Sequence, residues 1–283
     1  TYGPVLGLDE LRESLASKWS RQYQGKVSKE NVAVTSGCNQ AFCASISSFT
    51  SENDEVIIPT PWYFNHHMWL QMAGVKSIPL DTDANMNPII EKAEALITDR
   101  TRAIVLVSPN NPSGAIYSNQ LLQKFFDLCK SNQIRLIIDE TYKDFHPNAS
   151  QPHTLLENNN WDQVLTILYS FSKTYRMTGH RIGALLTSKE NLIEIEKALD
   201  TFTVCPPQLG QYAANWGLNN LEAWAAERRT EILQRAKHFS EKFQPLSAAG
   251  WSLKGCGAYF AFVEHPFEDE SNTLAPLILR DQG

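Results

Sequence analysis

Short apolar runs alternate with longer amphipathic stretches along most of this chain. The runs are rich in valine, isoleucine and leucine, and they predict strands at 32–35, 55–58, 103–107, 135–138, 164–169 and 183–187. The stretches between them predict helices at 40–49, 65–73, 88–97, 119–131 and 191–199. Nearly continuous apolar strands are typical of a parallel sheet that is covered on both faces. We therefore expect an α/β fold with a central, mostly parallel sheet covered by helices.

The pattern changes after Pro206 and Pro207. Two helices are predicted at 208–217 and 221–243, followed by short β-like pieces at 251–253 and 258–263. We divide the chain into an N-terminal connecting segment (1–30), a large domain (31–218) and a smaller, incomplete α+β domain (219–283) that begins at the long helix. The first residue is Thr1 and no closing element is evident near Gly283, so we expect further residues of the natural protein at both ends.

Composition and charge narrow the classes of function. The formal net charge of -6, with no basic stripe, argues against a nucleic-acid surface. No apolar run approaches the roughly 20 residues of a membrane span, so no membrane association is predicted. The five cysteines are scattered without a CxxC pair, which is typical of reduced thiols in a cytoplasmic protein. The histidines show no metal-ligand spacing, so no metal site is predicted.

Polar residues follow several of the predicted strands, where an α/β sheet binds its ligands. Gly37 lies in a turn before a helix, and such a turn can seat a phosphate. Aromatic residues at 62–63 could stack on a flat ring. The prolines and glycine at 108–114 indicate a tight turn that presents asparagine amides. Each of these features, taken alone, is also consistent with ordinary turns or local packing.

Two further strand ends carry charged side chains. Asp139 ends an apolar strand, where a carboxylate needs a cationic partner. Lys173 follows another strand among hydroxyl side chains, and a lysine can form an imine with a carbonyl group. Together the strand ends offer a phosphate seat, a stacking ring, an amide donor, a carboxylate and an amine. This set of groups matches the needs of pyridoxal 5'-phosphate.

In these motifs the sequence resembles the class I/II aminotransferases, which are fold-type-I pyridoxal-phosphate enzymes. The resemblance runs from Tyr2 to about Val263. Its most specific part is the segment at 170–173 with Arg181 after it, and the segments at 111–114 and 139–142 precede it at family-like distances. The resemblance implies transfer of an amino group from an L-amino acid to a 2-oxo acid by a ping-pong mechanism.

The resemblance also implies a role for individual residues. Lys173 would hold the cofactor as a Schiff base and then act as the base at substrate Cα. Asp139 would keep the pyridine nitrogen protonated, while Tyr142 and Asn111 would bond to the phenolic oxygen of the ring. Tyr63 matches the stacking aromatic by its spacing, although neighbouring Trp62 is its rival.

The remaining implied contacts concern the phosphate and a second subunit. The residues implied at the phosphate are Gly37, Cys38, Asn39, Ser170, Ser172 and Arg181. Tyr2 matches a tyrosine that reaches the phosphate of the neighbouring subunit in the family, which implies a homodimer with shared active sites.

Other activities of the same fold stay open at this point. A C–S β-lyase, a decarboxylase or a cyclopropane-forming synthase would use the same lysine chemistry, and the motifs do not separate them. A regulatory domain that senses pyridoxal phosphate is a further alternative, which would need a DNA-binding module. A nicotinamide dehydrogenase is disfavoured because no GxGxxG motif follows the first strand.

Overall fold

A seven-stranded sheet forms the centre of the computed structural model, which describes residues 1–148 and 151–282. Its strands are β1 (Val32–Thr35), β2 (Glu55–Pro59), β3 (Lys76–Leu80), β4 (Thr101–Val107), β5 (Arg135–Asp139), β6 (Leu165–Ser170) and β7 (Gly183–Leu186). The order across the sheet is β1-β7-β6-β5-β4-β2-β3. Strand β7 runs antiparallel to both of its neighbours, and the other pairs are parallel. The predicted mostly parallel α/β sheet is confirmed.

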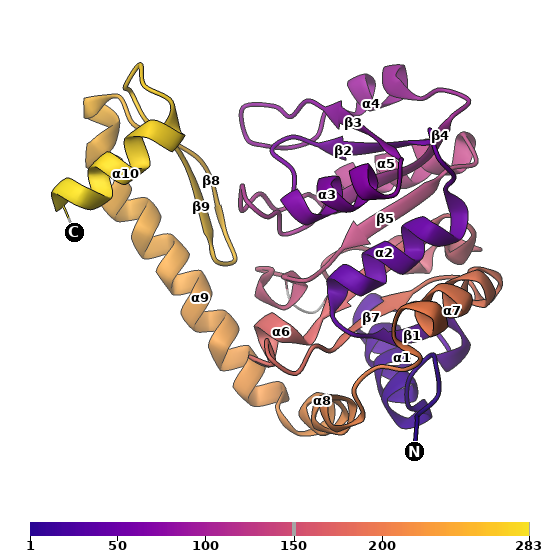
Figure 1. Ribbon diagram of the computed structural model, residues 1–283. Helices are drawn as coiled ribbons and strands as arrows, with labels where there is room; N and C mark the ends of the chain where they lie inside the picture. The colour runs from indigo at the N-terminus through magenta and orange to yellow at the C-terminus, as the bar shows by residue number, and fades with distance from the viewer. Residues whose placement is uncertain (149–150, 283) are drawn as a thin grey trace.

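Helices cover both faces of this sheet (Figure 1). The helices that accompany the sheet are α1 (Asp9–Tyr23), α2 (Cys38–Phe49), α3 (Phe64–Met72), α4 (Ile90–Leu96), α5 (Asn119–Ser131), α7 (Lys189–Thr203) and α8 (Gln208–Asn220). Alternate strand residues point to opposite faces and divide the interior into two apolar clusters. Helices α1 and α5 bury their apolar side chains in one cluster, and α2, α3 and α7 in the other.

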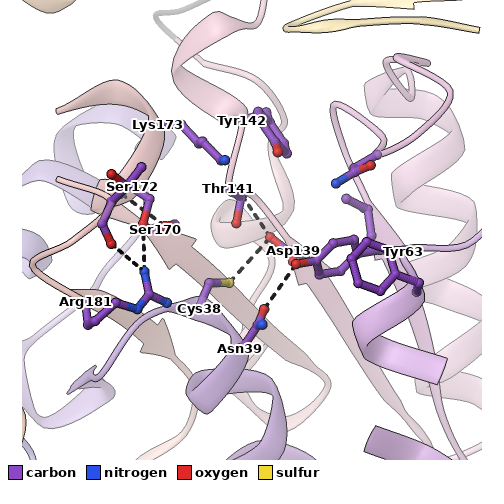
Figure 2. Close-up of a pocket in the computed structure, with 14 residues that line it drawn as sticks. Cys38, Asn39, Tyr63, Asp139, Thr141, Tyr142, Ser170, Ser172, Lys173 and Arg181 are labelled. Atoms are coloured by element: carbon purple, nitrogen blue, oxygen red, sulfur yellow. Dashed lines mark hydrogen bonds between the residues drawn. The ribbon is translucent and has the colours of Figure 1, made fainter. Parts of the chain in front are cut away.

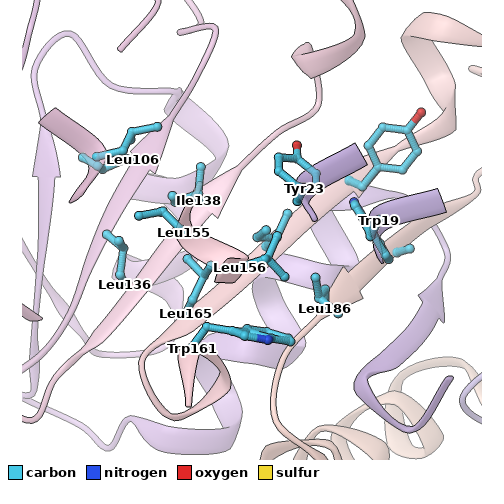
Figure 3. Close-up of a cluster of buried hydrophobic side chains, with 14 of the residues drawn as sticks. Trp19, Tyr23, Leu106, Leu136, Ile138, Leu155, Leu156, Trp161, Leu165 and Leu186 are labelled. Atoms are coloured by element: carbon cyan, nitrogen blue, oxygen red, sulfur yellow. The ribbon is translucent and has the colours of Figure 1, made fainter. Parts of the chain in front are cut away.

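Helix α1 lies within the segment that we predicted as a connection, and no helix was predicted there. Its side chains Leu11, Leu15, Trp19 and Tyr23 are buried in the first cluster, against strand residues such as Ile138 (Figure 3). Only this narrow stripe is apolar, and charged residues surround it in the sequence. The helix therefore depends on the sheet for its burial.

Strand β3 was also absent from the prediction. It pairs only with β2 and so forms one edge of the sheet. Its sequence is short and partly polar and contains Pro79, a residue that sheets tolerate at an edge. An edge strand of this kind lacks the continuous apolar run that identified the buried strands.

The C-terminal part of the described chain extends away from the sheet along the long helix α9 (Glu222–Phe243) (Figure 1). It continues with the antiparallel hairpin of β8 (Ser252–Gly257) and β9 (Phe260–Glu264), and with α10 (Ser271–Gln282), which was not predicted. The hairpin reaches back to the large sheet, because the Phe260 ring packs edge-on at 5.0 Å from the Tyr142 ring. None of the described helices combines the length and the apolar character that crossing a membrane demands.

Candidate active site

A cavity of about 420 Å³ opens where β4, β5 and β6 end (Figure 2). This size lies within the range of small-molecule sites. The residues that line it are Cys38, Asn39, Tyr63, Phe64, Val107, Asn111, Asp139, Thr141, Tyr142, Ser170, Ser172, Lys173, Thr178 and Arg181. The structure thus brings together the predicted site residues, apart from Gly37, which adjoins the cavity, and Tyr2, which lies elsewhere.

Asp139 is the last residue of β5 and is buried at the floor of the cavity. Its Oδ1 accepts a hydrogen bond from the Thr141 amide at 2.9 Å and lies 3.6 Å from the Cys38 sulfur. Its Oδ2 lies 3.4 Å from Nε2 of His66, which is also buried. Burial raises the pKa of the Asp139 carboxyl, but the bonds from His66 and Thr141 outweigh it and lower that pKa. The carboxylate is therefore held ionised.

His66 contacts a residue of the candidate site, and the sequence analysis did not identify it. It belongs to α3, three residues after Tyr63, and its ring stacks on Phe42 at 4.0 Å. The Tyr63 ring meets it edge-on at 5.1 Å. One turn of α3 thus presents an aromatic side chain to the cavity and a hydrogen-bond donor to Asp139. In the sequence, the three-residue spacing between Tyr63 and His66 was the only signal of this contact. That spacing indicates a contact with Asp139 only once the helix is placed beside β5.

Cys38 faces the Asp139 carboxylate with its side chain. Burial, with the nearby charge of Asp139, raises the pKa of the Cys38 thiol well above its ordinary value. The thiol is therefore neutral and can donate its hydrogen to Asp139 Oδ1. The resemblance implied a phosphate contact for Cys38, whereas the contact seen in the structure joins its side chain to Asp139.

The opposite side of the cavity is positively charged. Arg181 Nη1 donates to the Thr178 carbonyl oxygen at 2.9 Å and lies 3.4 Å from Ser172 Oγ. Gly37 is the N-cap of α2 with a φ of 92°, and a Cβ atom there would lie 2.1 Å from Arg181 Nη2. No acidic side chain in the described part of the chain forms an ion pair with this guanidinium. Arginine, hydroxyls and a helix N-terminus together suit an anion.

Lys173 lines the same cavity. It belongs to the short helix α6 (Phe171–Thr174), and its Nζ is 5.8 Å from the centre of the Tyr142 ring. Tyr142 is hydrogen bonded to Asn111, while burial and the charge of Asp139 raise the pKa of its hydroxyl. The hydroxyl therefore keeps its proton and can donate it to an oxygen of a ligand.

Further findings concern lining residues that were not predicted, Tyr2 and possible metal ligands. Phe64, Val107, Thr141 and Thr178 also line the cavity, although the sequence analysis gave them no role at the cofactor. Tyr2 is 82% exposed, and the neighbouring Thr1 carbonyl accepts a hydrogen bond from Gln208 of α8 at 2.9 Å. Among residues 1–148 and 151–282, no group of three or more His, Cys, Asp or Glu side chains is placed to hold a metal ion.

The family follows from a comparison of the whole chain with known proteins. The sequence model described as aminotransferase class I and II matches residues 1–282. The chain belongs to the class I and II aminotransferases. This aminotransferase is 28% identical to the aspartate aminotransferase of Thermotoga maritima, over 97% of its own length and 74% of that relative. It is 31% identical to aromatic aminotransferase ISS1 of Arabidopsis thaliana, over 94% of its own length and 68% of that relative.

Solved structures agree with this assignment. The structure of the aromatic aminotransferase from Pyrococcus horikoshii superposes on 99% of this aminotransferase with a TM-score of 0.91 and 27% identity, and the match covers 76% of that chain. The alanine aminotransferase from Pyrococcus furiosus superposes with a TM-score of 0.88 and 25% identity, over 99% of this chain and 73% of that one. The predicted family and fold are therefore confirmed.

The residues present fit pyridoxal phosphate, the cofactor that this family generally uses. The cofactor is a flat cationic ring with an aldehyde and a phosphate. Among the described residues, Asp139 is a buried, ionised carboxylate without a lysine or arginine partner in the cavity, and Arg181 is a cation without an acidic partner. Lys173 supplies an amine to the same cavity. The cavity thus offers one matching group for each functional part of the cofactor.

Proposed function

We propose that this aminotransferase binds pyridoxal phosphate through Lys173 and transfers the amino group of an L-amino acid to a 2-oxo acid. The observation that supports the proposal most strongly is that Lys173, Asp139 and Arg181 line one cavity. When bound, the cofactor supplies an aldehyde that condenses with amines and a ring that withdraws electrons from the reacting carbon.

Different residues of the cavity would bind the phosphate, the ring nitrogen and the ring of the cofactor. Arg181, the hydroxyls of Ser170 and Ser172 and the first turn of α2 would bind the phosphate. Asp139 would hold the proton on the ring nitrogen through a charge-assisted hydrogen bond. Further contacts to the ring would come from Tyr63 by stacking and from Tyr142 and Asn111 by hydrogen bonds.

Lys173 has a second role in this proposal. Its amine lines the cavity that the substrate would enter, and it would carry a proton to and from substrate Cα. Because the amino acid and the 2-oxo acid would enter the same cavity in turn, we expect ping-pong kinetics.

The test is an absorbance titration of the full-length protein with pyridoxal phosphate. We expect a visible band that is lost in Lys173→Ala and retained in Lys189→Ala, a control that removes an exposed lysine of α7. A mixture of amino acids should bleach the band and yield 2-oxo acids. A band that forms without Lys173 would contradict the proposal, and release of ammonia in place of a transferred amino group would favour a lyase.

We further propose that two copies share their active sites, with Tyr2 reaching the cavity of the partner subunit. Tyr2 is exposed beside α8, which also exposes Leu209 (85%), Tyr212 (54%) and Trp216 (60%). The spacing of these three side chains places them on one face of the helix, and an exposed apolar face is typical of a protein interface. Sedimentation analysis should give a dimer, and Tyr2→Phe should weaken pyridoxal phosphate binding. A monomer that binds the cofactor with unchanged affinity would refute this arrangement.

A further inference from the structure

Lys173 lies on a helix of only four residues, Phe171–Thr174. A helix this short does not sustain itself in water, because the first turn is unfavourable to form. Contacts with the rest of the protein must therefore set its position. Ser170 caps it by accepting a hydrogen bond from the Ser172 amide at 3.1 Å, and Phe171 is fully buried in the core.

The C-terminal end of this helix is held by Asp144. Thr174 directly follows Lys173, and its hydroxyl donates to Asp144 Oδ2 at 2.8 Å. The same oxygen accepts a hydrogen bond from the Tyr169 hydroxyl at 2.7 Å. Thr174 is buried, and Tyr169 belongs to β6, so Asp144 connects the strand before the lysine to the residue after it.

Asp144 is itself held in an ion pair with the buried Lys143. Lys143 Nζ lies 3.0 Å from Asp144 Oδ1 and donates to Gln22 Oε1 of α1 at 2.7 Å. Lys143 is 2% exposed, and its Nζ lies 5.0 Å from the centre of the Tyr169 ring. Burial raises the pKa of the Asp144 carboxyl, but the charges of Lys143 and Lys18 outweigh it, so the net direction is downward. Its hydrogen bonds to Thr174 and Tyr169 are therefore charge-assisted.

The short segment at 139–144 thus contacts both the cavity and the helix that carries Lys173. Asp139 and Tyr142 face the cavity, whereas Asp144 lies behind α6. We propose that Asp144, acting through the Thr174 hydroxyl, is a positioning residue that fixes α6 and thereby the amine of Lys173. The inference rests on the proposed function of Lys173, and neither Asp144 nor Thr174 lines the cavity.

Thr174→Val tests this proposal because it removes the hydroxyl and preserves the volume of the side chain. Thr174→Ser restores the donor. Thr166→Val is a matched control, since Thr166 is a buried threonine of β6 whose hydroxyl lies 3.0 Å from that of Thr187. In hydrogen exchange on the cofactor-free, full-length protein, we expect the amides at 172–176 to exchange about tenfold faster in Thr174→Val, as expected for loss of one charge-assisted bond. The serine variant and the control should match the wild type there.

The second measurement is the rate at which the Lys173-dependent visible band appears after pyridoxal phosphate is added. We expect this rate to fall about tenfold in Thr174→Val and to change less than about twofold in Thr174→Ser and Thr166→Val. Equal exchange and equal rates in Thr174→Val and Thr166→Val would overturn the proposal. If the wild type forms no such band, the proposed function fails, and the exchange comparison alone decides whether Asp144 positions α6.

Discussion

The contact between His66 and Asp139 gives a prediction that can be worked out in magnitude. His66→Phe keeps an aromatic ring in place to stack on Phe42, but removes the ring nitrogen that lies 3.4 Å from Asp139 Oδ2. A hydrogen bond to a charged group contributes about 1.5–3 kcal/mol, and both partners here are buried. We expect the free energy of unfolding of the cofactor-free protein to fall by that amount at pH 7.

The dependence on pH follows from the lowered pKa of Asp139. A carboxyl whose pKa is lowered by folding stabilises the protein above its ordinary value, 3.8, and this contribution is lost as the pH falls through the folded value. His66→Phe raises the Asp139 pKa. The loss of unfolding free energy caused by His66→Phe has a part that depends on the ionised carboxylate. This part should therefore be at its full size at neutral pH and disappear in acid.

The part that depends on the carboxylate is measured as the coupling energy between positions 66 and 139. Denaturant unfolding of four proteins gives it: the wild type, His66→Phe, Asp139→Asn and the double variant. The coupling energy between the two positions should be about 1.5–3 kcal/mol at pH 7. His67→Phe is the control, since His67 stacks on Trp62 and its Nδ1 lies 2.9 Å from Ser77 Oγ, away from Asp139. A coupling energy no larger than the one measured in the same way between His67 and Asp139, or one that does not change between pH 7 and acid, would refute the reasoning.

Two glycines give further predictions. Gly37→Ala should cost about 1–3 kcal/mol of stability in thermal unfolding, because φ is 92° there. It should also weaken pyridoxal phosphate in an absorbance titration, because the new Cβ displaces the Arg181 guanidinium. Gly179→Ala, with no other atom within 4 Å of its added Cβ, should change neither quantity. Gly257→Ala places a Cβ 2.3 Å from the Gly114 carbonyl oxygen, so amides of the β8–β9 hairpin should exchange hydrogen faster. Unchanged exchange there would contradict the observed contact.

Much of the candidate site could be predicted because the residues follow strands. The carboxyl ends of β4, β5 and β6 meet at one edge of a parallel sheet. Residues at or just after those ends, such as Asn111, Asp139 and Lys173, are therefore neighbours in space although they are distant in sequence. The order of the apolar runs was enough to place them together, and the family motifs supplied their roles.

Other elements depended on contacts that no local pattern shows. The direction of β7 is one example: the 170–182 connection carries α6 and then returns, so β7 runs antiparallel beside β6. His66 was missed since its partner Asp139 belongs to another strand, and Asp144 was missed since it lies behind the cavity. These contacts join side chains with no common motif.

The sequence by itself determined the buried strands, the helices between them and the chemistry of the strand ends, because apolar periodicity and residue type are local properties. Only the tertiary structure decided the edge strand β3, the burial of helix α1 and the partners of Asp139 and Asp144. The physical reason is that marginal helices, edge strands and buried charges are stable only when a distant part of the chain covers or pairs with them.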